Sequence, residues 1–192
     1  VGEGASCLGH GGRGGRRRDP GGMWLGEVRD LGSSSPALRA AEPGHLVFGT
    51  LHTQSAPATI DRIVDVFPPE AQEQVRIMIA GSLQAVVTQA LLPTADGNGR
   101  VAALEILLPD DAVRNLIRQA KVEQVSSIMQ TNTARGMQTL EQALADLASR
   151  RVVSIEDDLN LSRQPDRLLC LLQRSGIAAH GHTGHPAATD TA

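Results

Sequence analysis

Residues 44–67 read GHLVFGTLHTQSAPATIDRIVDVF, and this stretch decides the fold. Its first part, residues 45–51, is a continuous apolar run between turn residues, which is typical of a strand buried on both faces of a parallel sheet. Four apolar residues then recur at helical spacing: Ile60, Ile63, Val64 and Phe67. A buried strand that leads directly into an amphipathic helix predicts an α/β core that begins near residue 45.

The sequence on either side of this core predicts further elements. Upstream, we expect a short strand over residues 23–28 and a short helix over residues 36–41. The turn signal DGNG at 96–99 lies between two runs with strand character, so these strands should form a hairpin. The downstream pattern predicts strands over 83–92 and 100–107 and helices over 70–82, 111–121, 123–130, 137–149 and 154–160.

The composition is that of an ordinary soluble globular protein, because 41% of the 192 residues are apolar and 20% are charged. With one Trp, two Phe and no Tyr, the core must be aliphatic, and there is no aromatic platform on which single-stranded nucleic acid could stack. The net charge of -3 also argues against binding to polyanions. We therefore expect no nucleic-acid partner.

No membrane-spanning segment and no metal site are predicted. No apolar run approaches the roughly 20 residues that a membrane-spanning helix needs, so any membrane association should come through partners. Cys7 and Cys170 form no CxxC pair, which argues against a disulfide framework or a zinc ribbon and fits a cytoplasmic protein. His180, His182 and His185 lie in a Gly-rich tail without groups that would orient them toward a metal ion.

The two ends of the chain are expected to be disordered. Residues 1–22 are rich in glycine and offer almost nothing large to bury, and residues 175–192 are mostly Gly, His, Ala and Thr. Residues 11–16, GGRGGR, are similar to an RGG-type RNA-binding tail but lack interleaved aromatics, so disorder or mistranslation is the preferred interpretation. Because the chain begins with Val rather than Met, we expect a fragment of a longer protein.

Two side chains could carry chemistry at the edge of the predicted parallel sheet. Glu27 ends the first short strand, and a carboxylate at this edge is where α/β nucleotide enzymes hold a base or a magnesium ligand. The alternative is that Glu27 caps a helix. His52 ends the strand over 45–51 and would face the same crevice, although a strand-end histidine can also be structural. His45 lies at the other end of that strand, about 20 Å away, so the two histidines cannot bind one metal ion.

Four segments stand out together: LGEVRD at 25–30, AAEPGHLVFGTLHTQSAPATIDRIVDVFP at 40–68, GRVAALEILLPDDAVRNLIRQAK at 99–121 and GMQTLEQALADL at 136–147. In order and spacing they resemble the PilT family of type IV pilus retraction ATPases. Residues 26–30 resemble the family's Walker B motif, and residues 44–53 resemble its histidine box. The residues that resemble the retraction motif are Ala112, Val113, Arg114, Asn115, Leu116, Ile117 and Arg118.

The resemblance implies the distal half of a RecA-like P-loop ATPase domain, followed by a C-terminal helical segment. It implies a cytoplasmic, hexameric motor, peripheral to the inner membrane, that hydrolyses ATP with Mg²⁺. Through the pilus platform protein, such a motor disassembles the pilus and drives twitching motility. Glu27 would polarise the attacking water, with His52 near the γ-phosphate. His45 and Arg62 would serve nucleotide binding, and Arg62 would read the nucleotide state between subunits.

The resemblance also divides the chain into segments. Residues 23–109 would be a partial RecA-like core with the Walker B-like motif and the histidine box, and residues 110–174 would be a C-terminal helical segment with the retraction motif. Residues 1–22 and 175–192 would flank them as disordered ends, the first of them disordered or mistranslated. In the retraction helix, Val113, Leu116 and Ile117 are expected to face the core, while Arg114 and Arg118 are expected to point outward toward a partner.

One departure from the family bears directly on activity. A P-loop needs the pattern GxxxxGK[ST], because its backbone N–H groups cradle the phosphates while the lysine neutralises their charge. The sequence has a single lysine, Lys121, which lies between Ala120 and Val122. We therefore expect the chain alone to be inactive as an ATPase and to bind ATP and Mg²⁺ weakly at best. The alternative function is a non-catalytic interaction module that binds or caps the ring of a secretion or pilus ATPase.

Residues 3–25 do not resemble the family, although Asp19-Pro20 lies at the family's distance before Glu27. The distance to Glu27 is preserved, but the family's apolar strand is missing. This combination suggests a frameshift or a sequencing error. An unbroken reading frame across codons 3–35 would exclude this hypothesis.

Overall fold

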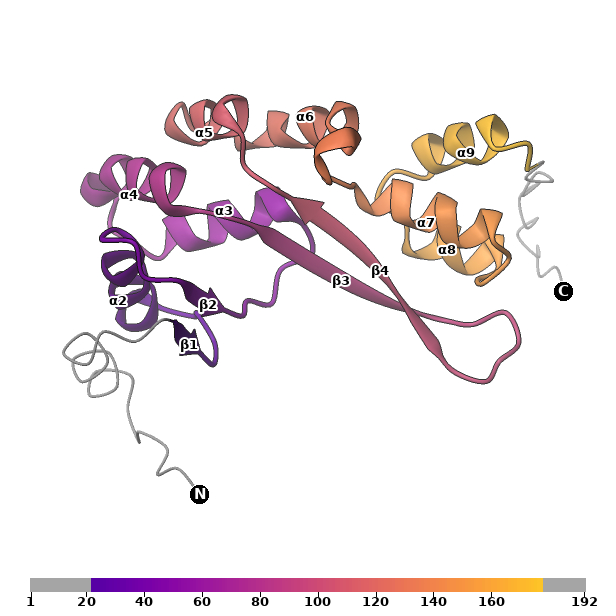
Figure 1. The fold of residues 1–192 in the computed structure, drawn as a ribbon, viewed down its shortest axis with the longest axis horizontal. Helices are drawn as coiled ribbons and strands as arrows, with labels where there is room; N and C mark the ends of the chain where they lie inside the picture. Colours follow the sequence, from indigo (N-terminus) through magenta and orange to yellow (C-terminus); the bar gives the residue numbers. More distant parts are fainter. Residues whose placement is uncertain (1–21, 178–192) are drawn as a thin grey trace, which may run out of the picture. The chain divides into compact units, whose positions relative to one another are not determined.

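The computed structural model describes residues 22–177 (Figure 1). The expectations for residues 1–21, for Cys7, for residues 178–192 and for the three tail histidines lie outside the described residues. The described chain forms two compact units, of which the first contains residues 22–90 and 104–139 and the second contains residues 91–103 and 140–177. The sequence motifs suggest a domain boundary after residue 109, whereas the contacts divide the chain at other residues. The boundary after residue 109 stays a prediction.

A two-stranded parallel sheet opens the first unit. β1 (Met23–Leu25) pairs with β2 (Val47–Gly49), and Trp24 lies opposite Phe48 in the register. The connection between the two strands contains α2 (Leu31–Ala41). Parallel strands need a long crossover of this kind, because the chain must return to the end of the sheet at which it started. Both predicted strands are therefore present, and their parallel pairing is confirmed.

α2 begins five residues earlier than the helix predicted over residues 36–41. Asp30 is its N-cap: the Asp30 carboxylate accepts a hydrogen bond from the Ser33 backbone N–H at 2.9 Å. The Ser33 hydroxyl in turn accepts a hydrogen bond from the Asp30 backbone N–H at 3.3 Å. This reciprocal capping fixes the start of the helix at Leu31. Pro36 lies inside the helix and does not mark its first turn, so the predicted start was wrong.

The prediction that the strand over 45–51 is buried on both faces was also wrong. Phe48 is 42% exposed, and Leu46, just before β2, is 47% exposed. Among the described residues this sheet has two strands only. The Phe48 ring stacks on Trp24 with ring centroids 4.6 Å apart, and Trp24 is itself 79% exposed. An apolar strand is buried on both faces only where further strands and helices cover it.

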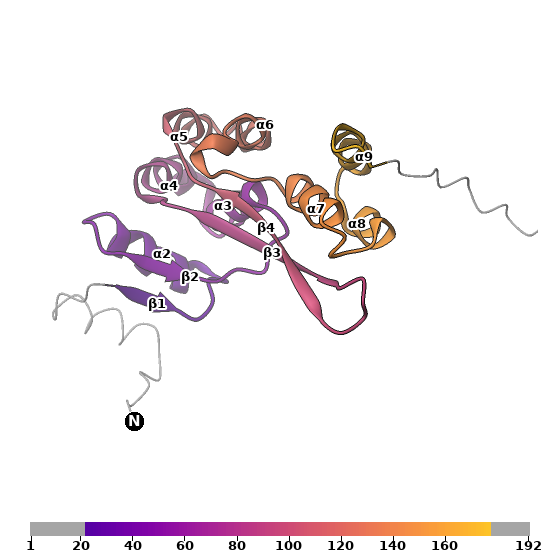
Figure 2. The ribbon, with the colours of Figure 1, turned by 45° about the vertical axis from the view of Figure 1, so that its right-hand side comes forward.

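The other helices of the first unit enclose an aliphatic core. They are α3 (Ala56–Asp65), α4 (Pro69–Ser82), α5 (Asp111–Arg118) and α6 (Val125–Thr131), with the short 3-10 turns η1 (Val122–Gln124) and η2 (Thr133–Arg135). Side chains at the centre of the core include Ile60, Ile79, Leu107, Ile117 and Met129. No aromatic side chain is among the buried residues of this core within the described chain, as the composition predicts. α4 and α5 lie side by side (Figures 1 and 2).

The long hairpin of β3 (Val86–Pro93) and β4 (Arg100–Leu107) passes through both units. Its base lies in the first unit, where Ile106 forms an antiparallel bridge with Gln138 through hydrogen bonds of 2.8 and 2.9 Å. Its tip lies in the second unit. Gly97 turns the chain there with a φ of 72°, a left-handed conformation that glycine adopts without strain. The predicted hairpin is confirmed.

The second unit is a small helical cluster with its own core. Together with the hairpin tip it contains α7 (Leu140–Ser149), α8 (Ile155–Leu161) and α9 (Pro165–Arg174). Its fully buried side chains include Leu144, Leu168 and Leu172. The helices predicted from the sequence end at about residue 160, so α9 was missed, although a proline in its first turn is a helix signal. No helix within residues 22–177 has the length and apolar character needed to cross a membrane.

Candidate functional site

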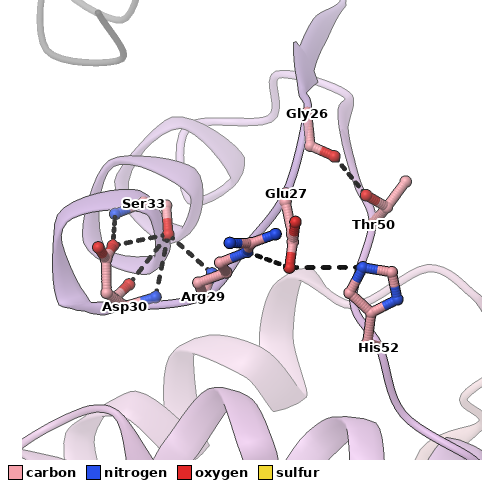
Figure 3. A network of polar contacts seen from close by, with 7 residues as sticks. All are labelled: Gly26, Glu27, Arg29, Asp30, Ser33, Thr50 and His52. Carbon is pink, nitrogen blue, oxygen red and sulfur yellow. Dashed lines mark hydrogen bonds and ion pairs between the residues drawn. The ribbon is translucent and has the colours of Figure 1, made fainter.

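The carboxyl ends of β1 and β2 bring Glu27 and His52 together (Figure 3). The Glu27 carboxylate oxygen Oε1 lies 3.5 Å from His52 Nε2. The Glu27 side chain is 24% exposed, and the His52 side chain is 85% exposed. The proximity that the sequence predicts is therefore present, at an edge of the sheet that a ligand can reach.

Hydrogen bonds beyond the ends of the two strands hold this arrangement. The Val28 backbone N–H donates to the Thr50 carbonyl at 2.9 Å, and the Thr50 hydroxyl donates to the Gly26 carbonyl. These bonds continue the parallel alignment past the last paired residues of β1 and β2. The residues that follow the strands, Glu27 and His52 among them, consequently stay next to each other.

Arg29 is the third side chain of the cluster, and the sequence patterns did not single it out. Its Nε forms an ion pair with Glu27 Oε1. The hydrogen bond from Arg29 lowers the pKa of Glu27 below its usual value, and the positive charge of Arg29 adds to this effect. Glu27 is therefore ionised at neutral pH. A carboxylate of lowered pKa is a weak proton acceptor, and it suits the task of orienting a water molecule better than that of removing a proton completely.

The alternative interpretation of Glu27 as a helix cap is wrong, because Asp30 caps α2. Hydrogen bonds from Ser33, from its backbone N–H first and from its hydroxyl second, lower the pKa of Asp30. In Figure 3 the Asp30–Ser33 pair and the Glu27–His52 pair lie on either side of Arg29. The two acidic residues of the segment thus differ in their contacts: Asp30 caps α2, and Glu27 contacts His52 at the edge of the sheet.

His45 and Arg62 do not take part in the contact between Glu27 and His52. His45 is a half-buried residue before β2, at the opposite end of that strand from His52. Arg62 is an exposed residue in the last turn of α3. The nucleotide-binding roles predicted for these two residues stay predictions.

Arg114, in the segment that resembles the retraction motif, does not point outward into solvent as expected. Its guanidinium donates hydrogen bonds to the carbonyls of Ala80, of Gly81 at 3.3 Å and of Leu83 at 3.1 Å. These carbonyls lie at the C-terminal end of α4, where the last turn contains no basic residue. The last carbonyls of a helix lack partners within it and carry partial negative charge, so a cation is stabilising there. Arg114 therefore acts within the fold as a cap for α4.

The other residues of α5 follow the predicted pattern in most respects. Val113 and Ile117 are fully buried, while Leu116 is only partly buried at the margin of the core. Arg118 is exposed, as predicted. The start of the helix is also as predicted, because the Asp110 carboxylate accepts a hydrogen bond from the Val113 backbone N–H at 2.9 Å.

The residues of this chain can supply the carboxylate and the imidazole of a nucleotide site, but not its phosphate cradle. Glu27 and His52 supply a carboxylate and an imidazole at the carboxyl edge of a parallel sheet, which is where such sites form. The sequence contains no GxxxxGK[ST] segment that could cradle phosphates. Within residues 22–177, no group of three or more His, Cys, Asp and Glu side chains is placed to hold a metal ion.

Comparison with known proteins shows what the chain is similar to. A family model described as "Type II/IV secretion system protein" matches residues 13–98. The expectation that residues 3–25 lack the resemblance was therefore wrong for residues 13–25. The chain is 54% identical over 140 residues to the "Twitching motility protein" of Neisseria gonorrhoeae, which covers 73% of this chain and 37% of that protein. It is 49% identical over 150 residues to the "Type IV pilus retractation ATPase PilT" of Pseudomonas aeruginosa, which covers 78% of this chain and 43% of that protein. The chain is thus similar to PilT-family proteins over about three quarters of its length.

A solved PilT structure confirms the fold. The crystal structure of the pilus retraction motor PilT with bound ADP superposes with a TM-score of 0.78 at 47% identity, and the match covers 87% of this chain and 47% of that one. The predicted α/β class, the distal half of a RecA-like ATPase domain followed by helices, is thereby confirmed. The chain spans about two fifths of the length of these two PilT-family proteins.

Proposed function

We propose that this chain is the distal part of a type IV pilus retraction motor, whose ATP hydrolysis drives pilus disassembly and twitching motility. The observation that carries the proposal is the 3.5 Å contact between Glu27 and His52 at the carboxyl ends of two adjacent parallel strands. The proposal is supported by the similarity of the chain to PilT-family proteins. It is also supported by the ADP bound in the related pilus retraction motor.

In this proposal the Glu27 carboxylate orients the water that attacks the terminal phosphate, and His52 faces that phosphate. Arg29 keeps Glu27 ionised, so the carboxylate is ready to accept a hydrogen bond from water at neutral pH. His45 and Arg62 serve nucleotide binding from the histidine box and from α3. A bound Mg²⁺ would neutralise phosphate charge, and the phosphate cradle would have to come from sequence outside this chain.

The partners follow from the same proposal. The motor would be a hexamer at the cytoplasmic side of the inner membrane, and it would act on the pilus platform protein. α5 carries the residues that resemble the retraction motif, and its Arg118 is exposed, so this side chain can meet a partner. Arg114 is less suited to that task, because α4 occupies its guanidinium.

A substitution at Glu27 tests the hydrolytic role. In a longer form of the protein that carries a P-loop, Glu27→Gln is expected to reduce turnover by about 10²-fold or more while nucleotide binding is largely kept. Glu73→Gln, which changes an exposed glutamate of α4, is the matched control and should leave turnover unchanged. An equal loss of nucleotide affinity and turnover in Glu27→Gln would make Glu27 a binding or structural residue instead.

The second candidate function is a non-catalytic module that binds or caps an ATPase ring. The absence of a GxxxxGK[ST] segment from the 192 residues favours it for the chain taken alone. The chain should then show no ATPase activity above background, and it should reduce the turnover of an intact PilT-family ATPase when added to it. Turnover by the chain alone that Glu27→Ala abolishes would contradict this expectation.

A further inference from the structure

His52 lies on a short connection, residues 50–55, between β2 and α3. Its side chain is 85% exposed, so packing against neighbouring side chains cannot hold it in one rotamer. What places His52 beside Glu27 is therefore the path of its backbone. Three sets of contacts determine that path.

The first two sets are local to the connection. At its start, Thr50 is tied to the end of β1 through Gly26 and Val28, as described above. At its end, the Thr53 and Thr59 hydroxyls lie 2.6 Å apart, so the connection is joined to the second turn of α3. The Ser55 hydroxyl also accepts a hydrogen bond from the Ala58 backbone N–H at 3.2 Å. Contacts of this kind are what a helix start normally has.

The third contact comes from far away in the sequence. Glu105, on β4, is 5% exposed, and its Oε1 accepts a hydrogen bond from the Ala56 backbone N–H at 2.6 Å. Ala56 is the first residue of α3, where backbone N–H groups have no partner within the helix. The Glu105 carboxyl oxygen therefore satisfies a donor that the helix itself leaves without a partner.

A buried carboxyl group is costly for a fold unless it is hydrogen-bonded. Ser55 already caps α3, so the helix could begin at this place without Glu105. What Glu105 adds is a link between the hairpin and the segment that carries His52, four residues before Ala56. This hydrogen bond therefore ties the segment that carries His52 to β4.

We propose that Glu105 is a positioning residue for His52: by holding the first N–H of α3, it sets where the preceding connection places the imidazole against Glu27. The role of this position in turnover rests on the proposed function. The positional effect itself does not depend on any activity and can be measured in the 192-residue chain.

The first experiment measures backbone hydrogen exchange in the chain by NMR. Glu105→Met removes the acceptor but keeps the side-chain volume, whereas Glu105→Gln keeps an acceptor oxygen at the same place. We expect amide exchange at Ala56 to accelerate by about 10- to 100-fold in Glu105→Met and by less than about tenfold in Glu105→Gln, and we expect the backbone amide resonances of residues 52–55 to shift in Glu105→Met. The Val113 amide, which Asp110 caps in the same unit, should exchange at its original rate.

A buried glutamate elsewhere provides the control. Glu141 is also 5% exposed and lies in the first turn of α7 in the second unit. Glu141→Gln should leave exchange at Ala56 and the resonances of residues 52–55 unchanged. The proposal is overturned if Glu105→Met leaves the resonances of residues 52–55 unchanged, or if the Val113 amide accelerates as much as the Ala56 amide, because the effect is then absent or is general destabilisation.

The second experiment tests the consequence for turnover in a longer, P-loop-bearing form of the protein. Glu105→Met should lower kcat by about tenfold or more with KM nearly unchanged, and Glu105→Gln should restore most of kcat. If that protein hydrolyses no ATP at all, the proposed function fails, while the NMR data still decide the positional role. If it hydrolyses ATP and Glu105→Met keeps the original kcat, the positioning role in catalysis is wrong.

Discussion

Glu27 carries its negative charge beside Arg29, and this pairing sets the pH at which the carboxyl group takes up a proton. Removing the guanidinium removes the largest cause of the lowered pKa. We therefore expect Arg29→Ala to raise the apparent pKa of Glu27 toward 4.5, the ordinary value for glutamate. Side-chain carboxyl ¹³C shifts of the chain, followed through an acid titration, measure this value.

Arg39→Ala is the control for this titration, since Arg39 is an exposed residue in the last turn of α2. It should leave the titration of Glu27 as it is. An unchanged Glu27 titration in Arg29→Ala would show that the ion pair is absent in solution.

Asp158 is a second carboxyl group with an unusual pKa. Its side chain is fully buried in α8, and neither of its oxygens has a hydrogen-bond partner within the described chain. Burial, with a smaller contribution from the neighbouring charge of Asp157, raises the pKa of Asp158 to about 7. In the unfolded chain the same group titrates near its ordinary value of 3.8. Between these two values the folded state binds the extra proton, so stability falls as the pH rises from about 4 to about 7.

Asp158→Asn removes the charge and should remove this pH dependence. At pH 8 we expect the variant to be more stable than the parent by about 1–3 kcal/mol, and at pH 4 we expect it to be no more stable. Urea unfolding at the two pH values measures both differences. Asp146→Asn breaks an exposed pair with Arg150 and should change stability by less than about 1 kcal/mol at either pH. A stability difference between Asp158→Asn and the parent that is the same at pH 4 and at pH 8 would contradict this account of Asp158.

At the scale of elements, α5 contains two arginines with different surroundings, so a substitution of one serves as the control for the same substitution of the other. Arg114 caps the C-terminal end of α4, whereas Arg118 is exposed. Arg114→Ala should lower the free energy of unfolding by about 1–3 kcal/mol, because the carbonyls of α4 lose their donors. Arg118→Ala should change it by less than about 0.5 kcal/mol. Chemical denaturation of the two variants measures the difference.

Twitching assays on the longer protein complete this comparison. Arg118→Ala should keep folding and hydrolysis but lose retraction if the exposed side of α5 meets a partner. Normal twitching in that variant would refute the partner role. Equal stability of Arg114→Ala and Arg118→Ala would refute the capping role of Arg114.

Most elements could be predicted from the sequence because their signals are local. Asp110 before α5, Ser55 before α3 and the turn around Gly97 fix element ends through contacts within a few residues. The start of α2 was wrong because a proline was taken as its first turn, while the Asp30–Ser33 cap lies further upstream. The exposure of β2 could not be predicted, since it depends on which other strands are present.

The candidate site also combines contacts that a sequence pattern can indicate with contacts that it cannot. The approach of Glu27 and His52 follows from two parallel strands that end side by side, which a sequence pattern can indicate. Arg114 and Glu105 are different, because each makes its contact across more than thirty residues of sequence. Their partners are backbone groups, a carbonyl or an N–H, which carry no residue-specific signal. No pattern in a single sequence could have identified these two contacts.

At the scale of the whole molecule, the two units have separate cores, and substitutions in each should act locally. Ile60→Ala opens a cavity in the core of the first unit, and Leu144→Ala does so in the second. Each should cost about 2–5 kcal/mol. Hydrogen exchange followed by mass spectrometry should show the loss of protection from Leu144→Ala in residues 140–174 and in the hairpin tip at 91–103, but not in residues 56–82. Equal loss of protection in both regions would show that the units unfold as one.

Trp24 gives the molecule an optical property. It is the only tryptophan of a chain without tyrosine, so nearly all of the intrinsic ultraviolet fluorescence comes from one indole. That indole is 79% exposed, stacks on Phe48 and lies three residues before Glu27. Its emission should therefore be that of a solvated indole, at long wavelength, and any strand, subunit or nucleotide that covers this part of the sheet should shift it toward the blue. The protein thus carries an unlabelled fluorescent reporter of what binds beside its candidate site.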